Sequence, residues 1–174
     1  MHRAVYPGTF DPIHLGHVDI ASRSAVIFDE LFVGIYERPA KTLLFSTEER
    51  IALAREALQN LPNVYVVAYE GLTVDFARQV GAQVIVRGLR VISDFEWEYQ
   101  MALTNRQLDP EIDFVCLMTR QEYAFLSSAI VKEVALLGGD VVGMAPSNVI
   151  AVLEEKRRDL ELRQGPAPLV SLRD

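Results

Sequence analysis

The sequence predicts an α/β fold: a Rossmann-like doubly wound sheet of about five parallel strands with flanking helices. Two observations carry this prediction. Short apolar runs alternate with segments of helical periodicity along the 174-residue chain. Polar residues of the kinds that bind phosphate also follow these runs, and parallel strands present their carboxyl ends at one edge of a sheet.

Five apolar runs are predicted as strands because they are short and bounded by turn residues. The second run is almost continuously apolar, as expected for a strand buried on both faces. Pro7 and Gly8 close the first run, and the single cysteine, Cys116, is expected to be a small buried side chain in the last. The predicted strands are residues 2–6, 31–36, 64–68, 84–86 and 113–118.

Helices are predicted where apolar residues recur every three or four positions. Ser46 followed by Glu49 is the pattern of a capping box, in which each residue bonds the other's backbone. Gly81 is suited to end a helix in the left-handed conformation. The predicted helices span residues 14–28, 46–61, 72–80, 95–107, 127–137 and 147–158.

One domain is expected over residues 1–158, since a chain of this length can bury a single core. Residues 159–174 contain Gly165, Pro166 and Pro168 and are predicted to be a loosely ordered C-terminal tail. No apolar run approaches the ~20 residues that span a bilayer, and the N-terminus lacks the apolar core of a signal peptide. A single cysteine needs no oxidising compartment, so we expect a cytoplasmic protein.

The chain is acidic, with a formal net charge of −7 from 17 basic and 24 acidic residues. This balance is not typical of a general nucleic-acid binder, which presents a basic face. A small phosphorylated ligand remains compatible with it, because a few well-placed cations suffice for one anion site. We therefore expect small-molecule ligands, with no nucleic acid and no membrane as partners.

The sequence YPGTFDPIHLGH, residues 6–17, leads from the first predicted strand into the first helix. The first backbone N–H groups of a helix have no partner within it, which makes a helix start a ready anion site. Thr9, His14 and His17 lie beside that start, and Gly8 and Gly16 let the backbone turn sharply. The histidines favour hydrogen bonds to phosphate oxygens; a metal pair and two helix-capping histidines are the alternatives.

Four other predicted strands are also followed by residues suited to phosphate. The arginines Arg87 and Arg90 match phosphate geometry with their planar donors, although surface pairing with Asp94 or Glu98 is an alternative. Serines at a helix start either cap that helix or hold phosphates on its N–H groups, and a lone lysine is usually solvated. The remaining residues in this group are Lys41, Thr73 and the segment 123–128.

Several common motifs are missing from the sequence. It has no GxxxxGK[ST] loop and no GxGxxG after the first strand, which disfavours P-loop ATP hydrolysis and ordinary NAD binding. No nucleophile stands out with a matched base and an orienting acid. Phosphoryl-type transfers need little covalent help, so positioning and charge stabilisation by the residues above would suffice.

These segments together resemble the bacterial phosphopantetheine adenylyltransferases, which belong to the nucleotidyltransferase superfamily with the HxGH signature. The resemblance rests on YPGTFDP with HLGH, on IVRGLR at residues 85–90, on DFEWEYQMALTNR at 94–106 and on YAFLSSAIVKEVA at 123–135. It implies transfer of the adenylyl group of Mg-ATP to 4′-phosphopantetheine by direct in-line attack, giving dephospho-coenzyme A and pyrophosphate.

The resemblance also assigns roles to individual residues. The catalytic residues would be His17, Lys41, Arg90 and Thr9, with Mg²⁺ arriving on the ATP phosphates rather than held by protein ligands. Phosphopantetheine would contact Thr9, Lys41, Thr73 and Arg87. ATP would contact Thr9, Phe10, His14, His17, Gly88, Leu89, Arg90, Glu98, Tyr123, Ala124, Phe125, Leu126, Ser127, Ser128 and Ala129.

Three positions depart from the family's usual residues: Tyr123 stands in place of Trp, Ala129 in place of a third Ser, and Thr73 in place of an aliphatic residue. They lie at the periphery of the implied sites and bear on affinity more than on reaction class. The resemblance further implies a homohexamer and feedback binding of coenzyme A. Two alternatives stay open: a nucleotidyltransferase with another acceptor or with CTP, and a non-catalytic nucleotide-binding protein of the same fold.

Overall fold

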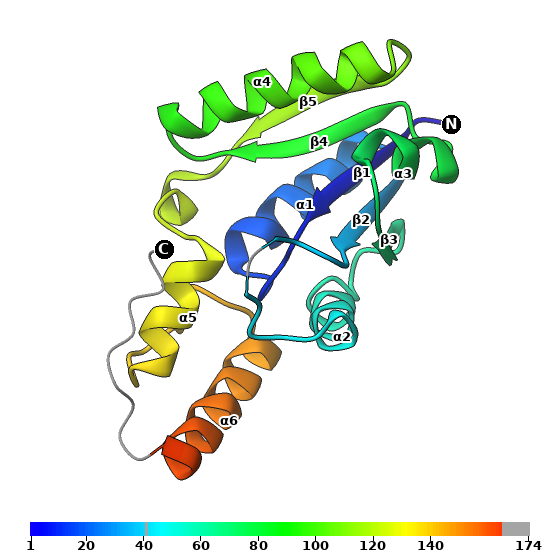
Figure 1. Cartoon of the computed structure of the whole chain (residues 1–174). Helices are drawn as coiled ribbons and strands as arrows, with labels where there is room; N and C mark the ends of the chain where they lie inside the picture. Colours follow the sequence, from blue (N-terminus) through cyan, green and yellow to red (C-terminus); the bar gives the residue numbers. More distant parts are fainter. Residues whose placement is uncertain (41, 165–174) are drawn as a thin grey trace.

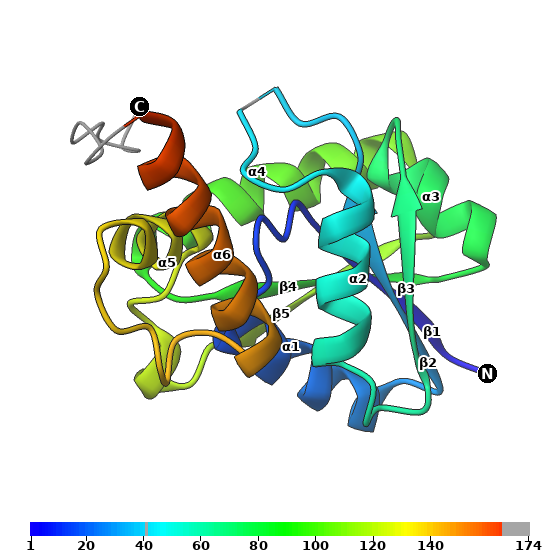
Figure 2. The same cartoon turned by 90° about the horizontal axis from the view of Figure 1, so that it is seen from below.

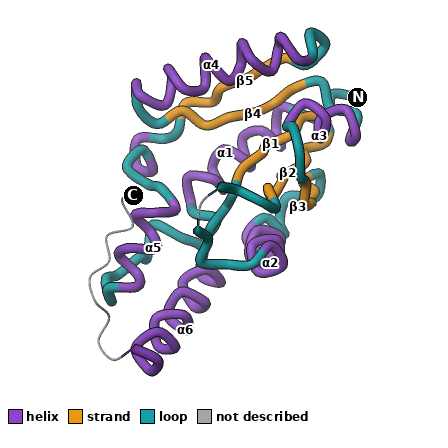
Figure 3. Tube along the Cα trace, in the orientation of Figure 1, coloured by secondary structure: helices purple, strands orange, loops and turns teal. Residues whose placement is uncertain are grey.

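The computed structural model describes residues 1–40 and 42–164. Strands and helices alternate along the chain, and the sheet lies between layers of helices (Figures 1 and 3). The elements are β1 (Arg3–Gly8), α1 (Leu15–Ile27), β2 (Glu30–Tyr36), α2 (Thr47–Ala57), β3 (Val64–Tyr69), α3 (Thr73–Val80), β4 (Val84–Leu89), α4 (Ile92–Leu108), β5 (Asp113–Met118), the 3₁₀ turn η1 (Gln121–Tyr123), α5 (Ser128–Leu136) and α6 (Ser147–Gln164).

The five strands form one parallel sheet in the order β3-β2-β1-β4-β5, which confirms the predicted fold class. The chain builds the sheet outward from β1 to β3 and then returns to the other side of β1 with β4. The strand order therefore reverses its direction between β1 and β4, which are neighbours in the sheet. In open α/β sheets, ligands bind outside the carboxyl ends of the strands at this kind of switch point.

Alternating side chains of each strand supply the cores on the two faces of the sheet. In β1, Ala4 and Tyr6 join the core under α1 and α2, whereas Val5 joins the core under α3. Helices α5 and α6 pack beside each other, and α6 packs on α2 (Figures 1 and 2). The two C-terminal helices therefore extend the helical layer that contains α2. Helix α4 covers β4 and β5 on the opposite face.

Two helix-end predictions are confirmed. The Ser46 hydroxyl accepts a hydrogen bond from the Glu49 N–H (3.2 Å), and the Glu49 carboxylate accepts one from the Ser46 N–H (2.7 Å), which is the capping box. Gly81 ends α3 with a φ of 67°, in the left-handed region that glycine adopts without strain.

Several predicted boundaries are wrong by a few residues. β1 continues through Pro7 and Gly8, which pair with β2, and β4 continues through Arg87 to Leu89, which pair with β5. These residues thus lie inside strands because each is paired with a residue of the neighbouring strand. In addition, α4 begins at Ile92 rather than at residue 95, and α2 ends at Ala57 rather than at 61.

The prediction that Cys116 is buried is also wrong, because its side chain is exposed. β5 is an edge strand, so its residues have a neighbouring strand on one side only.

Helix α6 corrects the expected tail boundary, since residues 159–164 are helical rather than loosely ordered. Ion pairs one turn apart, such as Arg157 with Glu161 (2.6 Å), support this last part of the helix. The rest of the predicted tail, residues 165–174, lies outside the described residues.

Candidate active site

A cavity of about 370 Å³ lies where the carboxyl ends of β1 and β4 meet. A smaller cavity of about 230 Å³ adjoins it on the side of β2, β3 and α4. Pro7, Gly8, Thr9, Arg87 and Glu98 line both cavities and form their shared wall. The larger cavity thus occupies the switch point of the sheet, where ligand binding is expected.

The turn after β1 is held in an unusual conformation. Phe10 has a φ of 49° and its side chain is buried, and a non-glycine residue in this region stores about 1–3 kcal/mol of strain. Next to it, the buried carboxylate of Asp11 accepts hydrogen bonds from the Leu44 N–H (3.2 Å) and the Phe45 N–H (3.0 Å) and pairs with Lys132 (2.5 Å). These contacts hold the turn in its strained conformation by linking it to the loop after β2 and to α5.

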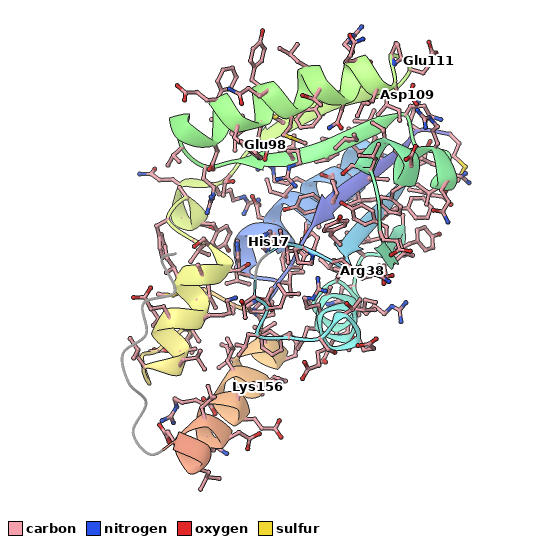
Figure 4. All side chains as sticks on the ribbon, in the orientation of Figure 1. His17, Arg38, Glu98, Asp109, Glu111 and Lys156 are labelled. Carbon is pink, nitrogen blue, oxygen red and sulfur yellow. The ribbon has the colours of Figure 1, made fainter. Side chains whose placement is uncertain are left out.

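The two histidines of the HLGH sequence lie against each other at the start of α1. Their rings stack with centroids 3.6 Å apart, and the backbone N–H of His14 donates a hydrogen bond to His17 Nδ1 (3.2 Å). Because Nδ1 accepts, the proton of a neutral His17 imidazole lies on Nε2, which becomes a donor. His17 lines the larger cavity, and Figure 4 shows it at the α1 end of the site.

His14 is buried, and its Nδ1 has no hydrogen-bond partner among the residues that the structure describes. Burial, together with the nearby positive charge of Arg90, lowers the pKa of His14 to about 3. The side chain is therefore a neutral imidazole at pH 7. Within the described ranges, no group of three or more His, Cys, Asp or Glu side chains is arranged to hold a metal ion.

Arg87 and Glu98 form a bidentate pair in the wall shared by the two cavities. Arg87 Nε and Nη2 donate to the Glu98 carboxylate at 2.7–2.9 Å, and Nη1 donates to the Pro7 carbonyl (2.5 Å). Burial lowers the pKa of Arg87, but the Glu98 carboxylate more than offsets this, so the net shift is upward. Figure 4 shows Glu98 on the side of α4 that faces the sheet.

Arg90 joins three segments around the larger cavity. Its Nε and Nη2 donate to the Asp94 carboxylate (3.0 and 3.1 Å), and its Nη1 donates to the Leu126 carbonyl (2.6 Å). Burial alone would raise the pKa of Asp94. The hydrogen bonds from Arg90 and its positive charge lower the pKa by more, so the net shift is downward. Both arginines thus pair with acids, the alternative that the sequence left open, and both also line the larger cavity.

The serines at the start of α5 are engaged with protein groups. Ser127 caps the helix, with its hydroxyl accepting from the Ile130 N–H (3.2 Å), and Ser128 donates to the Pro12 carbonyl (2.9 Å). The capping interpretation is therefore confirmed for Ser127. Both serines also line the larger cavity, so these bonds to protein groups are compatible with contact with a ligand.

The structure brings most of the predicted site residues together. The larger cavity is lined by Thr9, Phe10, His14, His17, Arg87, Gly88, Arg90, Glu98, Tyr123, Ser127, Ser128 and Ala129, and the smaller by Thr9, Thr73, Arg87 and Glu98. Four predicted residues do not line either cavity: Leu89, Ala124, Phe125 and Leu126. Lys41 lies outside the described residues.

Sequence reasoning missed several site residues, and two groups of them are instructive. Tyr36, Tyr69 and Thr119 line the cavities, and each is the last residue of a strand or follows one, so position alone could have found them. Asp11 and Arg50 are buried and stabilise the turn after β1 through hydrogen bonds. The sequence gives no signal for these two, because a charged residue in a loop or helix is usually solvated.

The comparisons with known proteins now decide the family. Residues 5–134 match the family described as cytidylyltransferase-like. The chain is 56% identical over 162 residues to the phosphopantetheine adenylyltransferase of Thermomicrobium roseum, with 91% of this chain and 97% of that protein covered. It is 53% identical to the phosphopantetheine adenylyltransferase of Methylococcus capsulatus, with 88% and 94% covered. The chain belongs to the phosphopantetheine adenylyltransferase family.

Solved structures agree with this family at the level of the fold. A Vibrio parahaemolyticus protein that carries the name of a nicotinate-nucleotide adenylyltransferase superimposes with a TM-score of 0.66 at 15% identity, covering 91% of this chain and 97% of its own. A lipopolysaccharide core biosynthesis protein from Thermoplasma volcanium gives 0.52 at 24% identity, covering 68% and 98%. Both are too distant in sequence to show more than the shared fold.

Membership in the phosphopantetheine adenylyltransferase family makes the chain a nucleotidyltransferase, and so an enzyme. It favours catalysis over the non-catalytic nucleotide-binding protein that the sequence left open. Among the described residues, no helix is both long and apolar enough to cross a membrane.

Proposed function

We propose that this protein transfers the adenylyl group of Mg-ATP to 4′-phosphopantetheine, giving dephospho-coenzyme A and pyrophosphate in coenzyme A biosynthesis. One observation supports this most: two adjoining cavities share a wall at Thr9 and Arg87. A nucleotide in the larger cavity and a phosphorylated acceptor in the smaller one would bring their phosphates together at that wall. The family membership supports the identity of both substrates.

In the proposed mechanism, an oxygen of the acceptor phosphate attacks the α-phosphorus of ATP in line. The new P–O bond forms as the bond to the β-phosphate oxygen breaks, and pyrophosphate leaves with that electron pair. His17 donates from Nε2 to the charge that develops on the α-phosphate. Thr9 and Lys41 orient the acceptor phosphate, and Arg90 binds the phosphates of ATP. No covalent enzyme intermediate is needed.

The carboxylates around the larger cavity bear on how Mg²⁺ is bound. Asp94 and Glu98 line the cavity, and each is paired with an arginine. This arrangement fits Mg²⁺ that arrives on the ATP phosphates, with its ligands supplied by the nucleotide and water. The ion would supply charge neutralisation on the leaving pyrophosphate.

The lining of the smaller cavity fits a long, weakly polar acceptor arm. Tyr36, Tyr69, Trp97, Met101 and Phe114 supply apolar and aromatic surface, with Thr73 and Asn105 as polar groups. Tyr69 and Thr73 lie within hydrogen-bond distance of each other (3.4 Å). We assign this cavity to the pantetheine arm and the shared wall to its phosphate.

Self-association is also part of the proposal. Large side chains on α4 and β5 are exposed, among them Phe95, Trp97, Tyr99, Leu103 and Met118. Such a surface is typical of a protein interface, and we propose the homohexamer implied by the family resemblance. We further propose that the enzyme works in the cytoplasm and that coenzyme A competes with the substrates at the two cavities.

Pyrophosphate release from a small panel of substrates tests the proposed reaction. Mg-ATP and Mg-CTP are each supplied with 4′-phosphopantetheine, with nicotinamide mononucleotide, or without an acceptor. We expect fast release only from Mg-ATP with phosphopantetheine. Faster release with CTP or with the other acceptor would assign a different nucleotidyltransferase. ATP binding without release in any mixture would contradict catalysis itself.

A further inference from the structure

A charged side chain outside the lining of both cavities holds their shared wall. Arg50 lies in the first turns of α2, and its side chain is fully buried. Its Nη1 donates to the carbonyls of Thr9 and Tyr36, both at 2.8 Å, and its Nη2 donates to the Thr47 hydroxyl (2.9 Å). Burying a guanidinium is costly, so this position calls for an explanation.

The acceptors of Arg50 lie at the carboxyl ends of two neighbouring strands. The ladder between β1 and β2 ends where Gly8 pairs with Ile35, and Thr9 and Tyr36 are the next residue on each side. Beyond this ladder β1 and β2 no longer pair with each other, although Tyr36 still pairs with Tyr69 of β3, and Arg50 supplies one donor group for both carbonyls. The guanidinium therefore extends the link between β1 and β2 by one residue, into the wall of the smaller cavity.

The acceptor side of the site benefits most from this link. Thr9 and Tyr36 both line the smaller cavity, whereas Tyr36 does not line the larger one. None of the hydrogen bonds of Arg50 reaches η1 or α5, whose residues line only the larger cavity. Loss of this link should therefore weaken binding of the acceptor more than binding of the nucleotide.

The charge of Arg50 is also not cancelled by a contacting acid. Within the described ranges it forms no ion pair, and the nearby carboxylate of Asp11 is already paired with Lys132. The guanidinium is therefore buried below a site for phosphates with no acid in direct contact, although the charges of Asp11, Glu37 and Glu48 act on it from nearby. A charge in a buried setting acts more strongly than one in water.

We propose that Arg50 is a positioning residue for the phosphorylated acceptor: it fixes Thr9 and the end of β2 at the shared wall of the two cavities. This inference rests on the proposed adenylyl transfer. Its role differs from that of a lining residue, because the guanidinium acts through the backbone of Thr9 and Tyr36 rather than by touching the substrate.

Steady-state kinetics of Arg50→Lys test the proposal. Lysine keeps the charge, but its side chain is one bond shorter and has no second nitrogen, so it cannot hold the two carbonyls and the Thr47 hydroxyl together as Arg50 does. We expect the KM for phosphopantetheine to rise and kcat to fall, with kcat/KM for this substrate lower by about 10–100-fold, as misplacement near a reacting group typically costs. The dissociation constant of ATP should change less than about 2-fold. A purely structural defect would lower kcat and leave both substrate constants unchanged.

Arg55→Lys is the matched control, because Arg55 lies on the same helix and also donates to a backbone carbonyl, that of Val66 (3.2 Å), away from both cavities. We expect near wild-type kinetics from it. Thr47→Val is a milder second variant for the case that Arg50→Lys does not fold, since it removes only the hydroxyl that orients Nη2. It should raise the KM for phosphopantetheine a few-fold.

Wild-type constants in the folded variant, or in Thr47→Val where the first variant does not fold, would overturn the proposal. So would equal losses for both substrates, or a lower kcat with both substrate constants unchanged. An inactive wild type would instead refute the proposed reaction, and the positioning role with it.

Discussion

The two cavities share a wall but are lined by different kinds of side chain. The larger one holds hydrogen-bonding and charged groups such as His14, His17, Arg90 and Ser127. The smaller one adds aromatic and apolar side chains, including Tyr69, Trp97 and Phe114, to polar groups such as Thr73 and Asn105. The difference indicates a division of labour, in which one cavity stabilises charge and the other selects an acceptor by contact area.

The largest effect is expected from His17→Ala, because His17 lies in the charge-stabilising cavity and directs Nε2 as a donor. Loss of one such donor typically lowers the rate by ~10²–10³. We therefore expect kcat to fall by that factor, with much smaller changes in the substrate constants, in a pyrophosphate-release assay. A variant with near-normal turnover would contradict this role and the division between the cavities.

A pH effect on stability is expected from His14, whose pKa falls to about 3 from an ordinary 6.5. Between these values the unfolded chain binds more protons than the folded one, so the free energy of unfolding decreases as the pH falls. From about pH 7 to about pH 5 the loss should be about 2 kcal/mol, measured by urea denaturation.

The control for this effect is His14→Gln, which has no titrating group at the same position. Its unfolding free energy should depend less steeply on pH, by the same ~2 kcal/mol over that interval. Parallel pH profiles for the variant and the wild type would show that His14 is not held neutral by its surroundings.

A smaller effect is expected on the acceptor side. Met101→Ala removes apolar surface from the smaller cavity, and Met101 is absent from the lining of the larger one. About 1 kcal/mol of lost contact should raise the KM for phosphopantetheine about 5-fold. The KM for ATP should stay the same. An equal rise in both constants would remove the distinction between the two cavities.

Patterns of local sequence predicted the fold and part of the cavity lining. Apolar runs gave the five strands, and the rule that ligands bind at strand ends located Thr9, Thr73, Arg87 and Arg90 around the site. Capping chemistry gave the start of α2 at Ser46. Each of these depends on residues that are close together in the chain.

What the sequence did not reveal depends on partners that are distant in the chain. Arg50 follows two glutamates in an amphipathic helix and reads as a solvated residue, yet carbonyls 41 and 14 residues away hold it inside. Cys116 reads as buried in an apolar run, but the sheet order places its strand at an edge. Arg87 reads as a loop residue, but pairing with β5 keeps it in a strand.

The most direct test of the account follows the α-phosphorus of ATP. Enzyme is mixed with α-³²P-labelled Mg-ATP, with and without 4′-phosphopantetheine, and the label is traced in nucleotide, acceptor product and protein. We expect labelled dephospho-coenzyme A in equal amount to pyrophosphate, no label on the protein, and no pyrophosphate without the acceptor. Label bound to the protein, or pyrophosphate released without phosphopantetheine, would contradict direct transfer between two adjoining cavities.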